Sequence, residues 1–174
     1  MPERKLYGDA KLIEALLSQM QLMEEAAGGW AAVYKDPASG RFWMKCYTTA
    51  GEQSGGGYQL LIRLPLPSTE ELIGAAILSP HEDEAVAAIM RLLEEEAVEQ
   101  KDFREQLLER LEGLDLASIN ADQKKRLREI ITLTSLADPM NRREVFGKTA
   151  GQLEADVAYF GAISERARQL LQKL

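Results

Sequence analysis

Apolar residues recur every three or four positions in the first part of the chain. They are Leu12, Ile13, Leu16, Leu17, Met20 and Met23. This spacing places them on one side of an α-helix, and Asp9 just before them is a typical N-cap residue. Gly28 can adopt the left-handed conformation that ends many helices. The pattern therefore predicts one amphipathic helix between Asp9 and Gly28.

After Gly28 the pattern changes to the alternation of a β-sheet. Residues 30–34, 41–47 and 58–64 alternate in character, and Pro37 and Gly40 lie between the first two segments. Proline favours a type I turn, and glycine accepts the positive φ that closes a short hairpin. The sequence predicts a three-stranded antiparallel meander, followed by a polar loop at residues 48–57 between its second and third strands.

The second strand presents two different faces. Phe42, Met44 and Cys46 share one face, which we expect to be the core face. The other face carries Trp43 and Tyr47 together with Arg41 and Lys45. Either a helix covers these two aromatic residues, or they form a partly open aromatic patch of the kind that protein interfaces use.

From residue 67 onward the pattern is helical. Four pairs have the spacing of a capping box, namely Ser68 with Glu71, Ser79 with Glu82, Asn120 with Gln123 and Thr149 with Gln152. Pro80 suits the first position of a helix, so we expect a helix from Pro80 to Gly113 with a bend near Gln100. Further helices are expected at 121–137 and after Thr149.

These elements predict an α+β fold, with an N-terminal helix, a three-stranded antiparallel meander and a mainly helical C-terminal part. The expected domains are residues 1–66 and 67–174, although the helices could equally cover the sheet as one domain. The chain has 174 residues, of which 45% are hydrophobic, so it can bury a core without a disulfide or metal.

Composition excludes several classes of protein. The chain has one cysteine and one histidine, which excludes an internal disulfide and a Cys/His zinc cluster. A signal-peptide-like start and an apolar run of membrane-spanning length are both missing from the sequence. We therefore expect a soluble, cytoplasmic protein.

Charge is concentrated in the middle of the chain. Residues 67–116 carry 14 acidic and 4 basic residues, out of a net charge of -7 for the whole chain. This segment should repel nucleic acid and attract a basic partner, with Glu95 and Glu99 as candidate contacts. Alternatively, it is the solvated face of a helix, partly paired with the basic residues of 124–128.

The candidates for chemistry are few. His81 is accompanied by no serine-containing elbow and no second histidine, so we expect an ordinary exposed histidine. Cys46 lies on the expected inward face, where a thiol acts as a small hydrophobic group. The run Gly55-Gly56-Gly57 lacks the Lys-Ser/Thr ending of a P-loop. We therefore predict no catalytic residue, no cofactor and no metal site.

An ordered series of motifs resembles a known family. The series comprises Gly29-Trp30, Tyr34-Lys35-Asp36-Pro37, Gly40-Arg41-Phe42-Trp43, Tyr47, Glu52, Gly55-Gly56-Gly57, Leu61 and Arg63-Leu64. Over residues 28–66 it is similar to immunity protein 27, a family of bacterial immunity proteins from polymorphic toxin systems. One departure is Ser54, which stands where the family usually has histidine.

The resemblance implies a protein that is not an enzyme and that binds and neutralises a cognate toxin. We expect the contact region of such a protein to include Trp43, Tyr47, Glu52, Gly55, Gly56 and Gly57, and the charge of the acidic segment adds Glu95 and Glu99 as a second contact. A basic nuclease domain would complement the acidic segment, and no direct contact with nucleic acid or membrane is expected. The alternative is a helical scaffold or oligomerising adaptor that associates through Leu107, Leu111, Phe160 and Ile163. The oligomeric state stays open.

Overall fold

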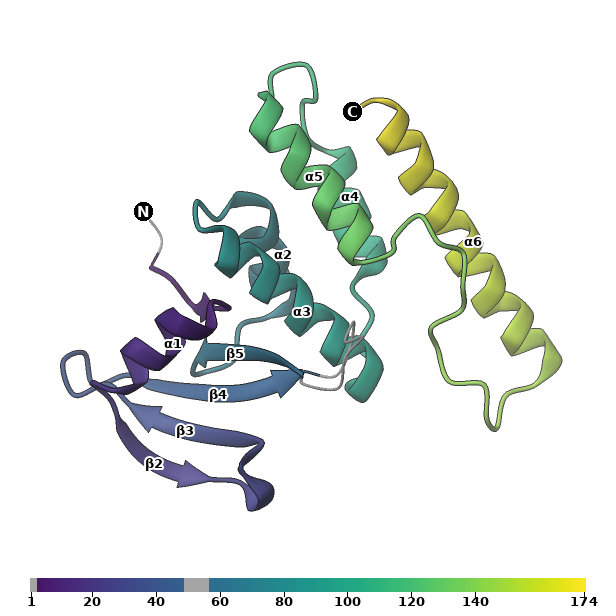
Figure 1. Cartoon of the computed structure of the whole chain (residues 1–174). Coiled ribbons are helices and arrows are strands. Elements are labelled where there is room, and N and C mark those ends of the chain that lie inside the picture. Colours follow the sequence, from purple (N-terminus) through teal and green to yellow (C-terminus); the bar gives the residue numbers. More distant parts are fainter. Residues whose placement is uncertain (1–2, 49–56) are drawn as a thin grey trace. The chain divides into compact units, whose positions relative to one another are not determined.

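The computed structural model describes residues 3–48 and 57–174, and the chain divides into two compact units, Met1–Glu94 and Glu95–Leu174 (Figure 1). An antiparallel sheet occupies the first unit, and helices dominate the rest of the chain. This arrangement confirms the predicted α+β class. The domain boundary expected after residue 66 stays a prediction.

The sheet has five antiparallel strands in the order β1-β5-β4-β3-β2. They are β1 (Leu6–Tyr7), β2 (Gln21–Glu25), β3 (Ala31–Lys35), β4 (Phe42–Thr48) and β5 (Tyr58–Arg63). The predicted meander corresponds to β3, β4 and β5. The prediction of only three strands is wrong, because β1 pairs with β5 and β2 pairs with β3 at the two edges.

The N-terminal helix is shorter than its apolar spacing predicts. Helix α1 (Ala10–Leu17) begins after Asp9, whose carboxylate accepts hydrogen bonds from the Lys11 and Leu12 N–H groups. The expectation that it continues to Gly28 is wrong, because residues 21–25 form β2. Pairing with β3 supplies these residues with main-chain hydrogen bonds that a longer helix would have supplied.

The turn between β3 and β4 follows the prediction. The Asp36 N–H donates to the Arg41 carbonyl at 2.8 Å, and the Gly40 N–H donates to the Asp36 carbonyl at 2.7 Å. Gly40 has φ +74°, a conformation that side-chain-bearing residues rarely adopt. The turn therefore holds β3 and β4 in the register that pairs Tyr34 with Trp43.

Both faces of the sheet carry buried residues. On one face, Ile13 of α1 packs with Trp43 and Leu61 in a buried cluster. On the other face, Cys46 is buried as expected, but Phe42 is 41% exposed. The expected core face is therefore confirmed at Cys46 and wrong at Phe42, and α1 covers the other side of β4 at Trp43.

Two helices follow the sheet in the first unit, and both are anchored at their ends. Helix α2 (Thr69–Leu78) starts with the predicted capping box of Ser68 and Glu71. Helix α3 (Glu82–Glu99) begins two residues after Pro80, so the predicted cap by Ser79 is wrong. Ser79 instead ends α2, and its hydroxyl oxygen accepts a hydrogen bond from the His81 N–H at 3.1 Å.

A buried carboxylate ties α3 to the edge of the sheet. Glu84 accepts hydrogen bonds from the N–H groups of Lys5 at 2.9 Å and Leu6 at 3.1 Å. It also accepts one from the Ser79 hydroxyl at 2.7 Å. These bonds satisfy donors at the start of β1 that would otherwise be buried without a partner.

The expected long helix from 80 to 113 is two helices. Gln100 has φ +55°, and the Lys101 N–H donates to the Glu95 carbonyl, which is the hydrogen bond of a Schellman ending. Helix α4 (Arg104–Glu112) then starts anew. The bend expected near Gln100 is therefore a full helix end.

Helices α5 (Ala121–Leu133) and α6 (Ala150–Gln172) complete the second unit, and both start with the predicted capping boxes. Helix α5 ends four residues before the expected Ala137, because Ser135 has φ +52°. The core of this unit includes Phe103, Leu107, Leu108, Leu111, Ile130, Ile131, Phe160 and Ile163. Among the described residues, none of these helices is long and apolar enough to span a membrane.

The variant Ile13→Ala should destabilise the first unit. We expect a loss of about 2–5 kcal/mol in the free energy of unfolding, because the change leaves a cavity between α1 and Trp43. Leu12→Ala is the matched control on the more exposed side of α1, with an expected change of about 0.5 kcal/mol or less. Urea denaturation measures both. Equal losses would contradict the packing of α1 against the sheet.

Candidate partner-binding surfaces

Tyr47 and Trp43 point to the same side of β4 but have different surroundings. Trp43 is buried beneath α1, and its ring lies 5.5 Å from that of Tyr7. Tyr47 is 38% exposed, and the Lys45 ammonium lies 5.6 Å from the centre of its ring. Of the two alternatives for this aromatic pair, a helix covers Trp43, whereas Tyr47 stays partly open.

Gly57 lies directly against Tyr47. It has φ +72°, and a Cβ atom at this position would lie 3.2 Å from the Tyr47 Cβ and 3.1 Å from the Thr48 carbonyl oxygen. Only glycine fits both the conformation and the space. We call Lys45, Tyr47 and Gly57 the open sheet surface. Glu52, Gly55 and Gly56, which the sequence analysis grouped with them, lie outside the described residues.

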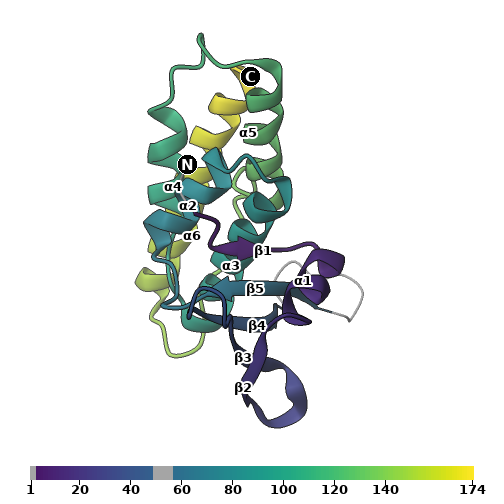
Figure 2. The same cartoon turned by 90° about the vertical axis from the view of Figure 1, so that its left-hand side faces the viewer.

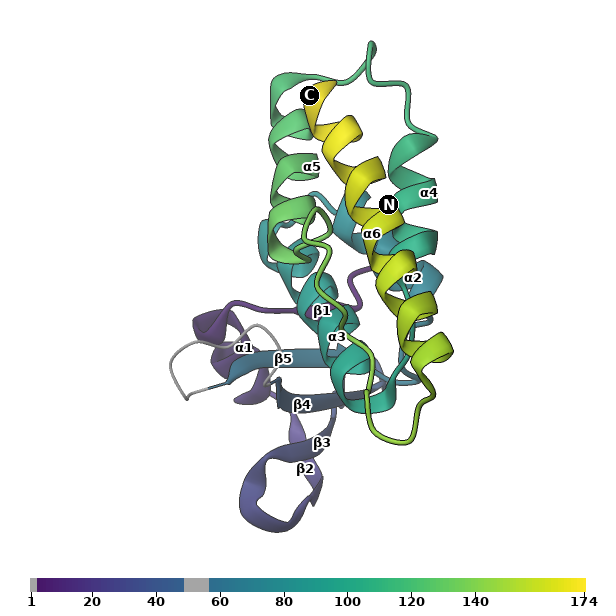
Figure 3. The same cartoon turned by 90° about the vertical axis from the view of Figure 1, so that its right-hand side faces the viewer.

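The β2–β3 hairpin carries further exposed apolar residues that sequence reasoning did not select as contacts. Trp30, just before β3, is 62% exposed, and Leu22 and Met23 of β2 are also exposed. Leu22 pairs with Tyr34, which pairs with Trp43, so Leu22 lies on the face that carries Tyr47. Figures 2 and 3 show the hairpin projecting from the sheet away from α2 and α3.

The two acidic candidates on α3 differ in accessibility. Glu95 is buried, and one of its carboxylate oxygens lies 3.8 Å from the Lys101 ammonium. Glu99, in the last position of α3, is exposed. Of this pair, Glu99 is therefore the residue whose side chain a partner can reach.

A network of ion pairs occupies the second unit, with Arg104 at its buried end. The guanidinium donates to both Glu96 carboxylate oxygens, at 2.5 and 2.8 Å, and to the Thr134 carbonyl oxygen at 2.8 Å. Arg104 and Arg143 both lie near the ring of Phe160, at 5.8 and 5.6 Å from its centre. The network therefore links α3, α4, α5 and α6.

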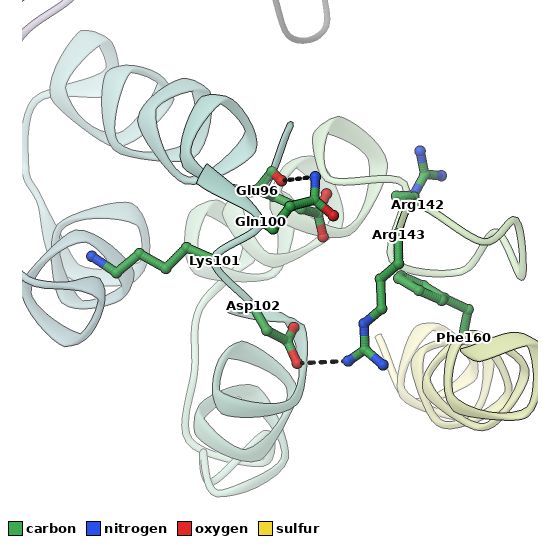
Figure 4. A pocket seen from close by; sticks show the side chains of 7 residues that line it. All are labelled: Glu96, Gln100, Lys101, Asp102, Arg142, Arg143 and Phe160. Carbon is green, nitrogen blue, oxygen red and sulfur yellow. Dashed lines mark hydrogen bonds and ion pairs between the residues drawn. The ribbon is translucent and has the colours of Figure 1, made fainter. Parts of the chain in front are cut away.

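Asp102 and Asp156 hold Arg143 at the exposed end of the network. Arg143 donates to Asp156 at 2.9 Å and to Asp102 at 3.3 Å, the latter drawn in Figure 4. Lys148 also donates to Asp156, and hydrogen bonds from Lys148 and Arg143 lower the pKa of that carboxyl below its ordinary value. The Tyr159 hydroxyl donates to Asp102 at 2.7 Å.

The pocket drawn in Figure 4 lies within this network. It has a volume of about 20 Å³ and is lined by Glu96, Gln100, Lys101, Asp102, Arg142, Arg143 and Phe160. A space of this size accommodates about one water molecule. Asp102 and Arg143 bind one another in it, and Glu96, Lys101 and Arg142 are paired with residues outside the lining. The pocket therefore serves the structure of the unit and does not have room for a substrate.

A larger pocket lies beside α2 in the first unit. Its volume is about 680 Å³, and its apolar lining residues are Leu6, Pro67, Gly74, Ala75, Leu78 and Pro80. His81, Ser79 and Glu84 also line it, but the Ser79 hydroxyl contacts Glu84 and the main chain of His81. To act as a nucleophile, the Ser79 hydroxyl would need a hydrogen bond to the imidazole ring of His81 rather than to its main chain. Among the described residues, no group of His, Cys, Asp and Glu is arranged to hold a metal ion.

One protein family matches part of the chain. The model described as immunity protein 27 matches residues 5–65. The match starts one residue before β1 and ends two residues after β5, so it spans the whole sheet and α1. It confirms the resemblance found over residues 28–66 and extends it to the N-terminal helix. No curated protein and no solved structure matches the chain.

The match makes the part of the chain that it covers similar to a family of immunity proteins. Immunity proteins of this kind act on a protein partner, the toxin, and are generally not enzymes. Residues 66–174 lie outside the match, and they include α2 to α6. The structure places Tyr47 and Gly57 together on the matched part, whereas Glu99 belongs to the remainder.

Cys46 should be unreactive in the folded protein. Burial raises the pKa of its thiol to about 11, so roughly one thiol in a thousand is ionised at about pH 8. We expect a thiol reagent such as Ellman's reagent to label the folded chain slowly and the urea-unfolded chain rapidly. Labelling of the folded chain at the rate of the unfolded one would contradict the burial of Cys46.

Proposed function

We infer that this chain is an immunity protein that binds a cognate toxin domain and neutralises it without catalysis of its own. The observation that carries this proposal is the extent of the family match. It covers a complete structural element, the five-stranded sheet with its helix α1, and not an isolated motif. When a fold element is preserved as a whole, we expect its binding surface to be preserved as well.

The open sheet surface is the proposed contact region of the first unit. Tyr47 combines an exposed ring with a fixed backbone, which is typical of residues that dominate binding energy at interfaces. Trp43 lies beneath α1 on the same face, and we assign it a supporting role, because it packs α1 against the strand that carries Tyr47. Glu52, Gly55 and Gly56 belong to the same proposed region by their place in the sequence.

The acidic residues of α3 supply the proposed second contact. Within the acidic run of this helix Glu95 is buried and Glu96 binds Arg104, so the exposed Glu99 defines the acidic surface proposed here. A basic partner would be attracted to this surface over several ångströms, which accelerates association more than it raises affinity. A toxin domain with a basic surface, such as a nuclease, fits this charge.

Co-expression tests the proposed function directly. The candidate toxin domain encoded by the gene directly upstream is expressed in a host cell with and without this chain. Restored growth, together with a 1:1 complex of the purified proteins, would support the proposal. Failure of the folded chain both to restore growth and to form a complex would overturn it.

Tyr47→Ala should weaken the complex by about tenfold or more, because the variant loses an exposed aromatic contact at the proposed interface. Phe42→Ala is the matched control, since Phe42 has nearly the same exposure on the opposite face of β4. Its expected change in Kd is about twofold or less. Isothermal titration calorimetry measures both, and an equal effect of the two changes would argue against the open sheet surface.

Glu99→Lys should slow association at low salt and have little effect at high salt, because it reverses one exposed charge of the acidic surface. Glu165→Lys, an exposed acidic residue on α6, is the control for the change in net charge. Stopped-flow or surface plasmon resonance measurements give the association rates. A rate that is the same for Glu99→Lys and the unaltered chain at low salt would remove α3 from the interface.

The alternative of an oligomerising adaptor depends on four apolar residues that the second unit uses for itself. Leu107, Leu111, Phe160 and Ile163 are all buried in the core formed by α4, α5 and α6. A dimer through these side chains would have to open that core. This arrangement favours the immunity proposal over the adaptor.

A further inference from the structure

Phe146 is the most exposed large hydrophobic residue among the described residues. Its side chain is 94% exposed, and it lies in the connection between α5 and α6, which we call the α5–α6 loop (residues 134–149). By contrast, Phe103 and Phe160 of the same unit are buried. Figures 1 and 3 show the loop passing along α6 before it turns back into the first residue of that helix.

The α5–α6 loop is held in place on both sides of Phe146. Arg143 and Lys148, three residues before and two residues after Phe146, bind the same carboxylate, that of Asp156 on α6. Within this span the Glu144 N–H donates to the Gln100 side-chain oxygen at 3.3 Å. The Lys148 N–H donates to the Val145 carbonyl at 3.4 Å. Phe146 is therefore presented by a folded segment.

A preformed segment loses little conformational entropy when a partner binds it. In a folded unit, large apolar side chains are ordinarily buried or only partly exposed. Aromatic residues are enriched among the residues that dominate the binding energy of interfaces. Val145 and Met140, in the same loop, are also exposed and extend the apolar area. The loop has the composition and the fixed geometry of a docking element.

The charges around Phe146 indicate the chemistry of the partner. The cations of the loop are paired within the unit, Arg142 with Asp138, and Arg143 and Lys148 with Asp156. Glu144 and Glu154 are exposed, and no ion pair between described residues involves either of them. Asp102, Asp138 and Asp156 together balance the three loop cations, so Glu144 and Glu154 leave an excess of acidic charge around the loop. This charge disfavours an anionic membrane or nucleic acid and favours a basic protein surface.

We propose that Phe146 is an anchor residue that enters an apolar pocket, rimmed by basic side chains, on the toxin domain. This inference rests on the proposed function for the identity of the partner. It adds a contact from residues that the family match does not cover. The second unit thereby contributes an attachment point of its own, separate in sequence from the open sheet surface.

Titration of purified variants with the catalytically disabled toxin domain of the upstream gene tests the proposal. Phe146→Ala should raise the Kd by about tenfold or more, because the variant loses the anchor. Val157→Ala, which truncates an exposed residue of α6 in the same unit, is the matched control and should change the Kd by about twofold or less. Because Phe146 is exposed, its truncation should leave the thermal unfolding temperature unchanged. A Kd for Phe146→Ala equal to that of the unaltered chain would overturn the proposal.

A charge comparison tests the basic rim. Phe146→Lys and Phe146→Glu both remove the apolar ring, but Lys would face like charges and Glu opposite ones. We expect Phe146→Lys to bind more weakly than Phe146→Glu by about tenfold at low salt, with a smaller difference at high salt. Equal affinities at low salt would overturn the assignment of a basic rim.

The measurements separate this inference from the function on which it rests. If the unaltered chain binds the toxin domain and Tyr47→Ala weakens binding, but Phe146→Ala does not, the anchor alone is overturned. If the unaltered chain neither binds the toxin domain nor restores growth, both the proposed function and the anchor are overturned.

Discussion

The second unit depends on one buried charge, the guanidinium of Arg104. A buried arginine is tolerated only when nearby acceptors satisfy it, and here Glu96 takes two of its donors and the Thr134 carbonyl takes a third. Removing one partner of such a pair costs about 3–5 kcal/mol, because the other charge stays buried without compensation. The requirement fixes the end of α3 and the end of α5 against the first turn of α4. Phe160 packs beside the same guanidinium, so α6 is bound by the same constraint.

The first unit has a different requirement, because its sheet carries apolar side chains on both faces and both faces must be covered. Residues of the matched segment cover one face themselves, since α1 packs on Trp43 and Leu61. The opposite face, with Cys46, is close to Arg91 and Glu94 of α3, which lies outside the match. Glu84 of the same helix binds the main chain at β1. The matched sheet therefore shares its unit, Met1–Glu94, with α2 and the first part of α3, which the matched segment does not include.

Local signals in the sequence predicted local structure well. The capping boxes at Ser68, Asn120 and Thr149 and the turn at Gly40 were found because each depends on residues within one turn of chain. The pairing of β1 with β5 joins residues far apart in sequence, and β1 is too short to show alternation. The sequence did not predict β2, because the spacing of Met20 and Met23 also fits a helix.

The candidate surfaces, too, could be predicted from the sequence only where they depend on local pattern. Alternation placed Trp43 and Tyr47 on one face correctly, but the choice between an open and a covered side chain depends on where α1 folds. Glu95 and Glu99 look equivalent in sequence, and tertiary packing buries the first and leaves the second exposed. Phe146 had no motif to mark it, since its significance comes from exposure and from ion pairs that form only in the folded chain.

The single, buried cysteine gives the chain a practical property. Because Cys46 is shielded, a cysteine introduced at an exposed position, such as Ser39 in the β3–β4 turn, would accept a fluorescent dye selectively without replacement of the native residue. Dyes placed in this way on the turn or on α6 would report separately on the surroundings of the two units.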